Sequence, residues 1–203
     1  SWLRNPLIDF CIKQPAGMVA LLVLLAMLFA GVFAERIAPY DPVRNNLASM
    51  LQPPGWKHLL GTDHLGRDAL SRLIHGARIT LLVALSSVFI GDSIGFIWGL
   101  VSGYLGRRFD MLSQRVLDVL LSFPTLILAM LMMVGLGSGL HTVIIAIAVS
   151  RVPLSTRVIR SVVLSVKEFA YIEAARSIGA TSAGIMLRHI APQCVAPLLV
   201  ILS

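Results

Sequence analysis

Hydrophobic residues in this chain form long runs separated by polar segments. The first run, Gln14–Ala34, has no charged residue, and the second, from about Arg78 to Tyr104, contains one acid, Asp92. A third run, Val119–Ser150, is uncharged for 32 residues. It would measure about 48 Å as a helix, which is too long for one straight crossing of a bilayer. The glycine-rich residues 135–139 divide it into a predicted hairpin of two spans.

The pattern predicts an all-α polytopic membrane protein with five spans visible. Only ten residues, Cys194–Ser203, remain for the fifth span, about 15 Å of helix against a hydrocarbon core of ~30 Å. The chain also begins with Ser1 rather than Met. We therefore expect a fragment that lacks N-terminal residues, the end of the fifth span and a sixth span. We divide it into an interfacial segment, residues 1–15, with a helix lying on the membrane within residues 2–13, and a transmembrane domain, residues 16–203.

Composition supports a membrane environment. The chain is 57% hydrophobic and 13% charged, with a mean hydropathy of +0.85, whereas a soluble domain carries roughly 25% charged residues. The net charge of +7 is not gathered into one stripe with aromatic residues, which argues against nucleic acid as a partner. Cys11 and Cys194 form no metal-ligand pattern and are interpreted as packing residues.

Lys and Arg predict the orientation of the spans. Residues 1–15, 104–116 and 151–192 hold 11 of these residues, and the opposite side, residues 35–78 with the glycine hairpin, holds 6. The first set is therefore predicted to be cytoplasmic. Accordingly, residues 39–77 form a predicted extracytoplasmic loop and residues 153–192 a predicted cytoplasmic loop, which we expect to start within Arg151–Arg160.

The cytoplasmic loop contains a polar, helix-prone segment. Phe169 and Ile172 share one face of a predicted short helix, Glu173 and Arg176 can support each other at i,i+3, and Gly179 is suited to end the helix. A second helix is predicted from Thr181 as N-cap. It would carry Ile185, Met186 and Ile190 inward until Pro192 interrupts it. Two short helices at a membrane surface indicate a docking surface for a soluble partner.

Four glycines in the second span, Gly91, Gly95, Gly99 and Gly103, recur every four residues and predict a face for close helix packing. Asp92 beside them is costly in lipid, on the order of 2.5–3.5 kcal/mol at mid-membrane. It is a candidate for the transport pathway, and a polar contact to a neighbouring helix is an equally open interpretation. Asp118 is predicted to pair with Arg115 at i,i+3.

The extracytoplasmic loop holds three histidines, His58, His64 and His75, together with acids. Their spacing is not compact and Arg67 would oppose a cation. We therefore expect no metal site and interpret the signature residues as a hydrogen-bonded turn that leads into the second span. The signature consists of Gly61, Thr62, Asp63, Gly66, Arg67 and Asp68.

The cytoplasmic segment resembles the EAA loop of ABC-importer permeases. The matching positions are Glu173, Ala174, Ala175, Gly179, Ile185 and Pro192. The resemblance implies a coupling helix that inserts into a cleft of a cytoplasmic ATPase. Glu173 and Arg176 would offer directional polar contacts there, and we interpret His189 as an orienting hydrogen-bonding residue of the loop rather than a proton relay. Gln193 departs from the family, which often has Asn there.

Further motifs resemble the dipeptide/oligopeptide/nickel permease family across nearly the whole chain. They are residues 38–42 (APYDP), 61–68 (GTDHLGRD), 76–78 (GAR), 115–118 (RVLD) and Phe123-Pro124. The resemblance implies the transmembrane domain of a type I ABC importer, a multi-pass protein of the bacterial cytoplasmic (inner) membrane. It implies a heterodimer with a second permease subunit, two cytoplasmic ATPase subunits that bind ATP and Mg²⁺, and an extracytoplasmic substrate-binding protein.

The chain itself contains no Gly-rich phosphate loop, nucleophile elbow or His-Glu-x-x-His motif. We therefore expect a transport subunit without its own cofactor or enzymatic activity. Peptides are the expected cargo and nickel the alternative. A secondary transporter without an ATPase would predict paired intramembrane charges and inverted repeats, which the pattern does not show.

Overall fold

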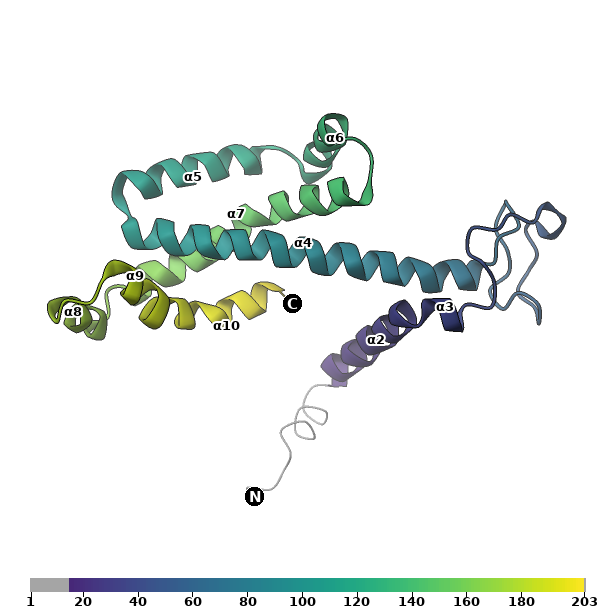
Figure 1. Cartoon of the computed structure of the whole chain (residues 1–203), viewed down its shortest axis with the longest axis horizontal. Helices are drawn as coiled ribbons and strands as arrows, with labels where there is room; N and C mark the ends of the chain where they lie inside the picture. Colours follow the sequence, from purple (N-terminus) through teal and green to yellow (C-terminus); the bar gives the residue numbers. More distant parts are fainter. Residues whose placement is uncertain (1–14, 203) are drawn as a thin grey trace, which may run out of the picture. The chain divides into compact units, whose positions relative to one another are not determined.

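The computed structural model describes residues 15–202, so the helix predicted within residues 2–13 lies outside the described residues. All regular elements of residues 15–202 are helical, and one isolated bridge joins Thr62 and Asp68 (Figure 1). The fold class is thus all-α, as predicted. The elements are α2 (Pro15–Val32), α3 (Ala34–Ile37), η1 (Leu47–Ser49), α4 (Ala69–Leu105), α5 (Arg107–Ser122), α6 (Thr125–Leu136), α7 (Leu140–Val166), α8 (Ala170–Ser177), α9 (Ser182–Ile185), η2 (Met186–Ile190) and α10 (Ala191–Leu202).

The chain divides into two compact units, one ending at Leu82 and the other beginning at Val83. The first unit contains α2, α3, the loop that precedes α4, and the start of α4. Of the residues in α2 only Gly31 is buried. A Cβ at Gly31 would lie 3.3 Å from the Cα of Arg78, so the two helices of this unit cross closely at this glycine.

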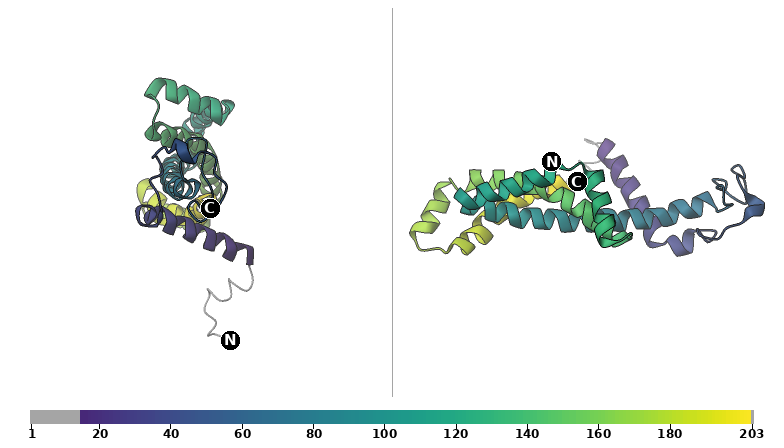
Figure 2. Two further views of the ribbon diagram at one scale, coloured as in Figure 1. Left: turned by 90° about the vertical axis from the view of Figure 1, so that its right-hand side faces the viewer. Right: turned by 90° about the horizontal axis from the view of Figure 1, so that it is seen from above.

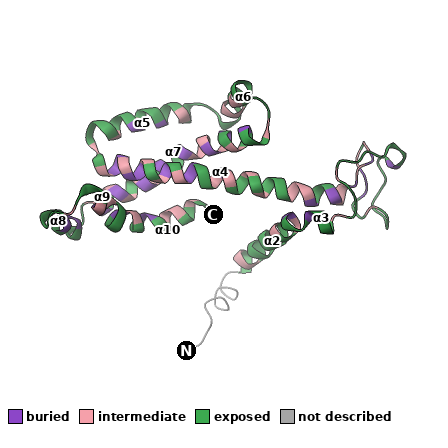
Figure 3. Ribbon diagram, in the orientation of Figure 1, coloured by how far each residue is buried: buried purple, intermediate pink, exposed green. Residues whose placement is uncertain are grey.

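The second unit is organised around the contact between α4 and α7. The four glycines of the predicted stripe belong to α4 and pack against α7. A Cβ at any of the four positions would come within 2.5–2.9 Å of an α7 atom. At Gly91 the obstacle is the carbonyl oxygen of Ala148, and at Gly99 it is that of Thr156. Backbone-to-backbone packing of this kind needs glycine in the membrane, where dispersion contacts drive helix association. Figure 3 shows the buried residues concentrated along these two helices.

The third apolar run does not form a simple span. α5 ends at Ser122 and α6 begins at Thr125, with a bend of 91° between them. Phe123 and Pro124 adopt extended backbone angles at the break, which fits the restriction that proline places on the preceding residue. The sequence predicted one span from Val119 to the glycines of residues 135–139, whereas the structure has two helices with this bend between them.

The α7 helix corrects the predicted start of the cytoplasmic loop. It runs unbroken to Val166, through Pro153, whereas the sequence suggested a loop from Arg151. The polar residues there are tolerated in a helix because they find partners on neighbouring helices. α7 also supplies Ile159, Val163 and Val166 to the hydrophobic core of the second unit.

The last helix corrects a second boundary. Pro192 does not interrupt it, because five residues of π-helix, Met186–Ile190, come directly before α10. The Ala191 amide donates to the Met186 carbonyl, one residue farther back than in an α-helix. Such a bulge accommodates a proline, which cannot donate to the carbonyl four residues earlier. The apolar helix therefore begins at Ser182 rather than Cys194.

Four helices of the described part are long and apolar enough to cross a membrane, and the bent α5–α6 pair is a fifth candidate. This agrees with the predicted five spans. In Figure 1 and in the right-hand view of Figure 2, α8 and α9 lie at one end of the second unit, and α6 lies away from them. The predicted docking segment is therefore a projecting tip.

Candidate functional site

The tip consists of α8, α9 and η2, which we call the hairpin (residues 169–190). Gly179 ends α8 with a φ of +87°. The Gly179 amide donates to Arg176 O at 3.0 Å and the Ala180 amide to Ala175 O at 3.1 Å, the two bonds of a Schellman motif. The Thr181 side chain then accepts from the Gly184 amide at 3.2 Å and begins α9. The predicted glycine stop and threonine cap are both present.

Apolar residues attach the hairpin to the rest of the second unit. Ile172, Ile185 and Ile190 are at most 1% exposed and belong to one cluster with Ile159 and Val163 of α7. Ala175 is buried in the same cluster, so its side chain is not available to a partner, whereas Ala174 is exposed. The hairpin is thereby held to the end of α7.

Polar side chains of the hairpin line a pocket of about 330 Å³ at the ends of α4 and α7. Glu173 and Arg176 line it together with Tyr104, Lys167 and Glu168. Within the described residues, no hydrogen bond or ion pair joins Glu173 to Arg176, contrary to the predicted i,i+3 pair, and neither side chain has another partner. His189 lies with its ring 6.3 Å from that of Tyr171. The hairpin thus buries Ile172, Ile185 and Ile190 and leaves Glu173 and Arg176 available.

Three arginines of α7 pair with aspartates of α4 and α5. Arg160 contacts both carboxylate oxygens of Asp110 at 2.5 Å, and Ser102 donates to the same carboxylate at 2.7 Å. Arg157 contacts Asp118 at 2.5 Å, which overturns the predicted Arg115–Asp118 pair. Lys167 reaches Gly103 O at 3.4 Å. These contacts tie the helix that precedes the hairpin to its neighbours.

Asp92 belongs to the same set of interactions. It is 1% exposed and accepts from Arg151 Nη2 at 2.7 Å and from the Ser155 hydroxyl. A buried carboxylate is tolerable when a cation and a hydroxyl satisfy it. The geometry favours the polar-contact interpretation, and a pathway role for Asp92 stays a prediction. Sequence reasoning missed these partners because it placed Arg151–Arg160 in a loop.

In the first unit, the predicted signature residues form a hydrogen-bonded turn before α4. Asp63 accepts from the Leu65 and Arg67 amides at 2.9 and 3.0 Å, from Arg67 Nε at 2.8 Å and from Arg72. Gly66 has a φ of +70°, and a Cβ there would lie 1.7 Å from Asn46 O. Burial raises the pKa of Asp63, but hydrogen bonds from Arg67 and Leu65 outweigh it and lower the pKa below its ordinary value.

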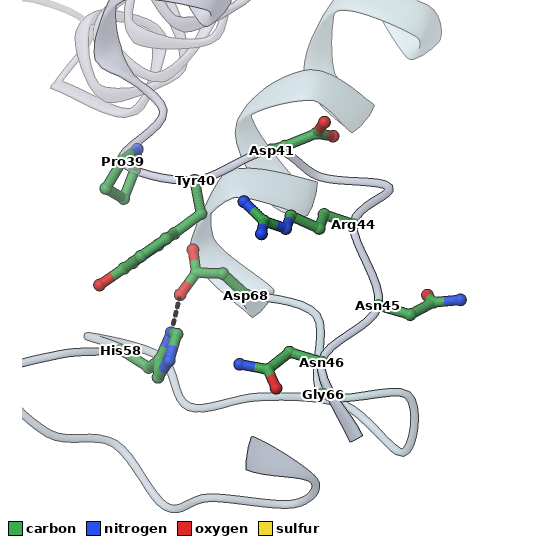
Figure 4. A pocket seen from close by; sticks show the side chains of 9 residues that line it. All are labelled: Pro39, Tyr40, Asp41, Arg44, Asn45, Asn46, His58, Gly66 and Asp68. Atoms are coloured by element: carbon green, nitrogen blue, oxygen red, sulfur yellow. Dashed lines mark hydrogen bonds and ion pairs between the residues drawn. The ribbon is translucent and has the colours of Figure 1, made fainter. Parts of the chain in front are cut away.

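Asp68 fixes the start of α4. Its Oδ2 accepts from the Ser71 amide and hydroxyl at 2.8 and 2.7 Å, and its Oδ1 lies 2.9 Å from His58 Nδ1 (Figure 4). Burial raises the pKa of Asp68, but the hydrogen bonds from Ser71 and His58 outweigh it, so the net pKa is lowered. Tyr40 stacks on His58 with ring centres 4.8 Å apart. Tyr40 and His58 were not among the predicted signature residues.

The histidines do not gather into a metal centre. His58 contacts Asp68, and His75 Nδ1 lies 3.0 Å from Ser71 O. Within residues 15–202 no group of three or more His, Cys, Asp or Glu side chains could hold a metal ion.

Comparison with known proteins gives the family. The family model described as "Binding-protein-dependent transport system inner membrane component" matches residues 95–203, which is more than half of the chain. The chain belongs to this family. A second model, "N-terminal TM domain of oligopeptide transport permease C", matches residues 12–54. The predicted family of ABC peptide-type permeases and its transmembrane fold are thereby confirmed.

Curated relatives support the same assignment. The chain is 41% identical over 186 residues to the di/tripeptide transport system permease protein DppC of Pseudomonas aeruginosa, covering 89% of this chain and 61% of that protein. It is 35% identical to the dipeptide permease DppC of Alkalihalophilus pseudofirmus (93% and 62% covered) and 40% identical to the glutathione permease GsiD of Escherichia coli (93% and 62% covered). The chain thus spans about three fifths of the length of these relatives, which are permease proteins, as predicted, rather than enzymes.

Proposed function

We propose that this chain is the main part of a permease subunit of an ATP-driven importer of the bacterial inner membrane. It would form half of the pathway for peptides together with a second, non-identical permease subunit. Two cytoplasmic ATPase subunits would bind ATP and Mg²⁺, and an extracytoplasmic binding protein would deliver the cargo. Movement of the ATPases would switch the spans between outward-open and inward-open states as a rigid-body change.

The observation that carries this proposal is that the hairpin is held to the second unit by buried isoleucines, while its charged residues Glu173 and Arg176 are exposed and unpaired within the described residues. Glu173 and Arg176 are exposed, and within the described residues neither side chain makes a hydrogen bond or an ion pair. A cleft on a soluble ATPase would supply partners for both. Since the hairpin shares a core with α7, a force applied to it would reach the membrane helices.

The peptide cargo is supported by the names of the relatives, which transport di- and tripeptides, dipeptides or glutathione. Nickel is the alternative cargo within the same mechanism. The separate engagements of His58 and His75 give it no support from the geometry.

The experiment that tests this proposal is co-purification of the complete transporter from cells that express all of its subunits. Replacing Glu173 with Ala should abolish or strongly reduce recovery of the ATPase subunits. The matched control is Glu35→Ala. Glu35 is an exposed acid that pairs with Arg78 in the first unit, and we expect it on the opposite side of the membrane.

The two variants together make the result specific. Normal recovery with Glu35→Ala and loss with Glu173→Ala is the expected outcome. Equal recovery of the ATPase with Glu173→Ala, Arg176→Ala and the wild type would contradict the assignment of the hairpin as the ATPase-docking segment.

A further inference from the structure

The turn that joins the hairpin to α10 contains one residue more than a regular α-helix would. Met186–Ile190 is a π-helical turn, closed by the bond from the Ala191 amide to Met186 O, and α9 and α10 continue it on either side. Turns of this kind occur frequently at functional sites. The extra residue also changes which side chains face the core.

The buried residues along this helix follow the π-turn. Ile185, Ile190 and Cys194 are at most 1% exposed and belong to the cluster that packs on α7. Ile190 and Cys194 are four residues apart, as on one face of an α-helix, whereas Ile185 and Ile190 are five apart. In an unbroken α-helix a spacing of five would place Ile185 about 140° away from Ile190. Only the π-turn lets Ile185 share the buried face.

An unbroken α-helix would bury Leu187 in place of Ile185. Leu187 lies three residues before Ile190 and seven before Cys194, which is the spacing of one helix face. In the structure the side chain of Leu187 is 66% exposed. The segment therefore has two registers that each bury one large aliphatic side chain, and the π-turn is the register that exposes Leu187.

Pro192 favours the π-turn over the unbroken α-helix. In a regular α-helix its ring would clash with the carbonyl group four residues earlier, which belongs to Arg188 within the π-turn. Pro153 and Pro197 lie in α-helix, so a proline by itself does not create a π-turn. At Pro192 the penalty decides between two registers that bury side chains of equal size.

The surface on which Leu187 is exposed suits a protein partner. Leu187 lines a pocket of about 410 Å³ together with the small residues Ala183 and Gly184. Arg188 and His189 line the same pocket and are exposed as well. An exposed arginine is costly in hydrocarbon, so this surface lies at the polar end of the helix. It belongs to the same hairpin as Glu173 and Arg176.

We propose that Leu187 is an apolar contact of the hairpin for the cytoplasmic ATPase subunit, and that Pro192 is the positioning residue that keeps Leu187 outward by favouring the π-turn. The proposal rests on the proposed function, because that function supplies the ATPase. It adds an apolar contact to the polar contacts of Glu173 and Arg176.

The first test measures recovery of the ATPase subunits with the complete transporter. Leu187→Asp should lower recovery by roughly tenfold, because a carboxylate is costly to desolvate against an apolar partner. The thermal stability of the permease should stay unchanged, since the side chain is exposed. Val43→Asp is the matched control: Val43 is a 74% exposed aliphatic residue of the loop before α4, which we expect on the other side of the membrane. It should leave recovery unchanged.

The second test measures the register by hydroxyl-radical footprinting of the complete transporter. Ile185 should be protected in the wild type and become modified in Pro192→Ala, with lower recovery of the ATPase. Deletion of Arg188 from Pro192→Ala removes the extra residue and sets Ile185 four residues before Ile190. It should restore both the protection of Ile185 and the recovery. Arg188→Ala alone should leave the protection of Ile185 unchanged.

The rescue separates positioning from a general stabilising role, because a deletion would not repair a helix that Pro192 merely stabilises. Unchanged protection of Ile185 in Pro192→Ala, or failure of the deletion to restore recovery, would overturn the role of Pro192. Normal recovery with Leu187→Asp together with loss in Glu173→Ala would reject this inference alone and place Leu187 against lipid. If the wild type recovers no ATPase, the proposed function fails instead.

Discussion

Two polar segments of this protein, the loop before α4 and the hairpin after α7, are built in opposite ways. In the loop, polar side chains form the frame, as Asp63, Thr62 and Asp68 each accept or donate several hydrogen bonds within the segment. In the hairpin, apolar residues form the frame, with Ile172 and Ile190 fully buried. Glu173 and Arg176 take no part in that frame.

The difference shows where each segment can offer interactions to a partner. The loop uses most of its polar groups internally, and only a few donors, such as Arg44, are left over. The hairpin uses almost none, so its charges are available to a partner. Polarity alone therefore does not distinguish a structural loop from a docking loop; the partners of the polar groups do.

The largest effect is expected from Gly66→Ala in the loop. A Cβ there would overlap Asn46 O at 1.7 Å in addition to the strain at φ +70°, so we expect a loss of about 4 kcal/mol or more in the stability of the first unit. Thermal unfolding and protease sensitivity of residues 39–68 in detergent would measure it.

The matched control is Gly179→Ala in the hairpin. Its φ is +87°, but nothing lies within 4 Å of the added Cβ, so the cost should be about 1 kcal/mol. Similar losses of stability for Gly66→Ala and Gly179→Ala would show that the loop is not packed more tightly than the hairpin.

Ile172→Ala tests the apolar frame of the hairpin. The side chain is 0% exposed in the core shared with α7, and truncation should cost about 3 kcal/mol. Hydrogen exchange should become faster in α8 and remain unchanged in the loop. Leu187→Ala, at a 66% exposed position of the same hairpin, should change stability by less than about 0.5 kcal/mol. Faster hydrogen exchange in the loop as well as in α8 would show that the hairpin and the loop do not open independently.

A smaller effect is expected from acid. Folding lowers the pKa of Asp63 and Asp68, so their contribution is fully present above the unfolded value near 4 and is lost as pH falls through the lower folded values. The loop should keep its stability from pH 7 to about pH 5 and weaken below pH 4. Asp68→Asn should lower stability at pH 7 by about 2 kcal/mol and flatten the acid profile. If the stability of Asp68→Asn fell with pH as steeply as that of the wild type, Asp68 would not be a source of the acid sensitivity of the loop.

Local sequence signals predicted much of both segments. The Schellman end at Gly179, the Thr181 cap and the Gly61–Asp68 turn each depend on residues close together in the chain, so residue type and spacing were sufficient. The glycine stripe was predictable for the same reason, since a period of four marks one helix face.

Long-range features were not predictable in this way. Arg151, Arg157 and Arg160 looked like loop residues because three charges within ten positions resemble a span end. Their acids lie 39–59 positions away, and only packing brings them together. The helix through Pro192 was missed because a π-helical segment has no clear sequence signature.

The central claim is that the charges of the hairpin serve a partner and not the fold. It is tested most directly by measuring substrate-stimulated ATP hydrolysis and thermal stability on the same reconstituted transporter carrying Glu173→Gln. We predict that stimulation by the cargo-loaded binding protein is lost while stability changes by less than about 0.5 kcal/mol. Full stimulation in this variant, or a loss of stability as large as that of Ile172→Ala, would contradict the claim.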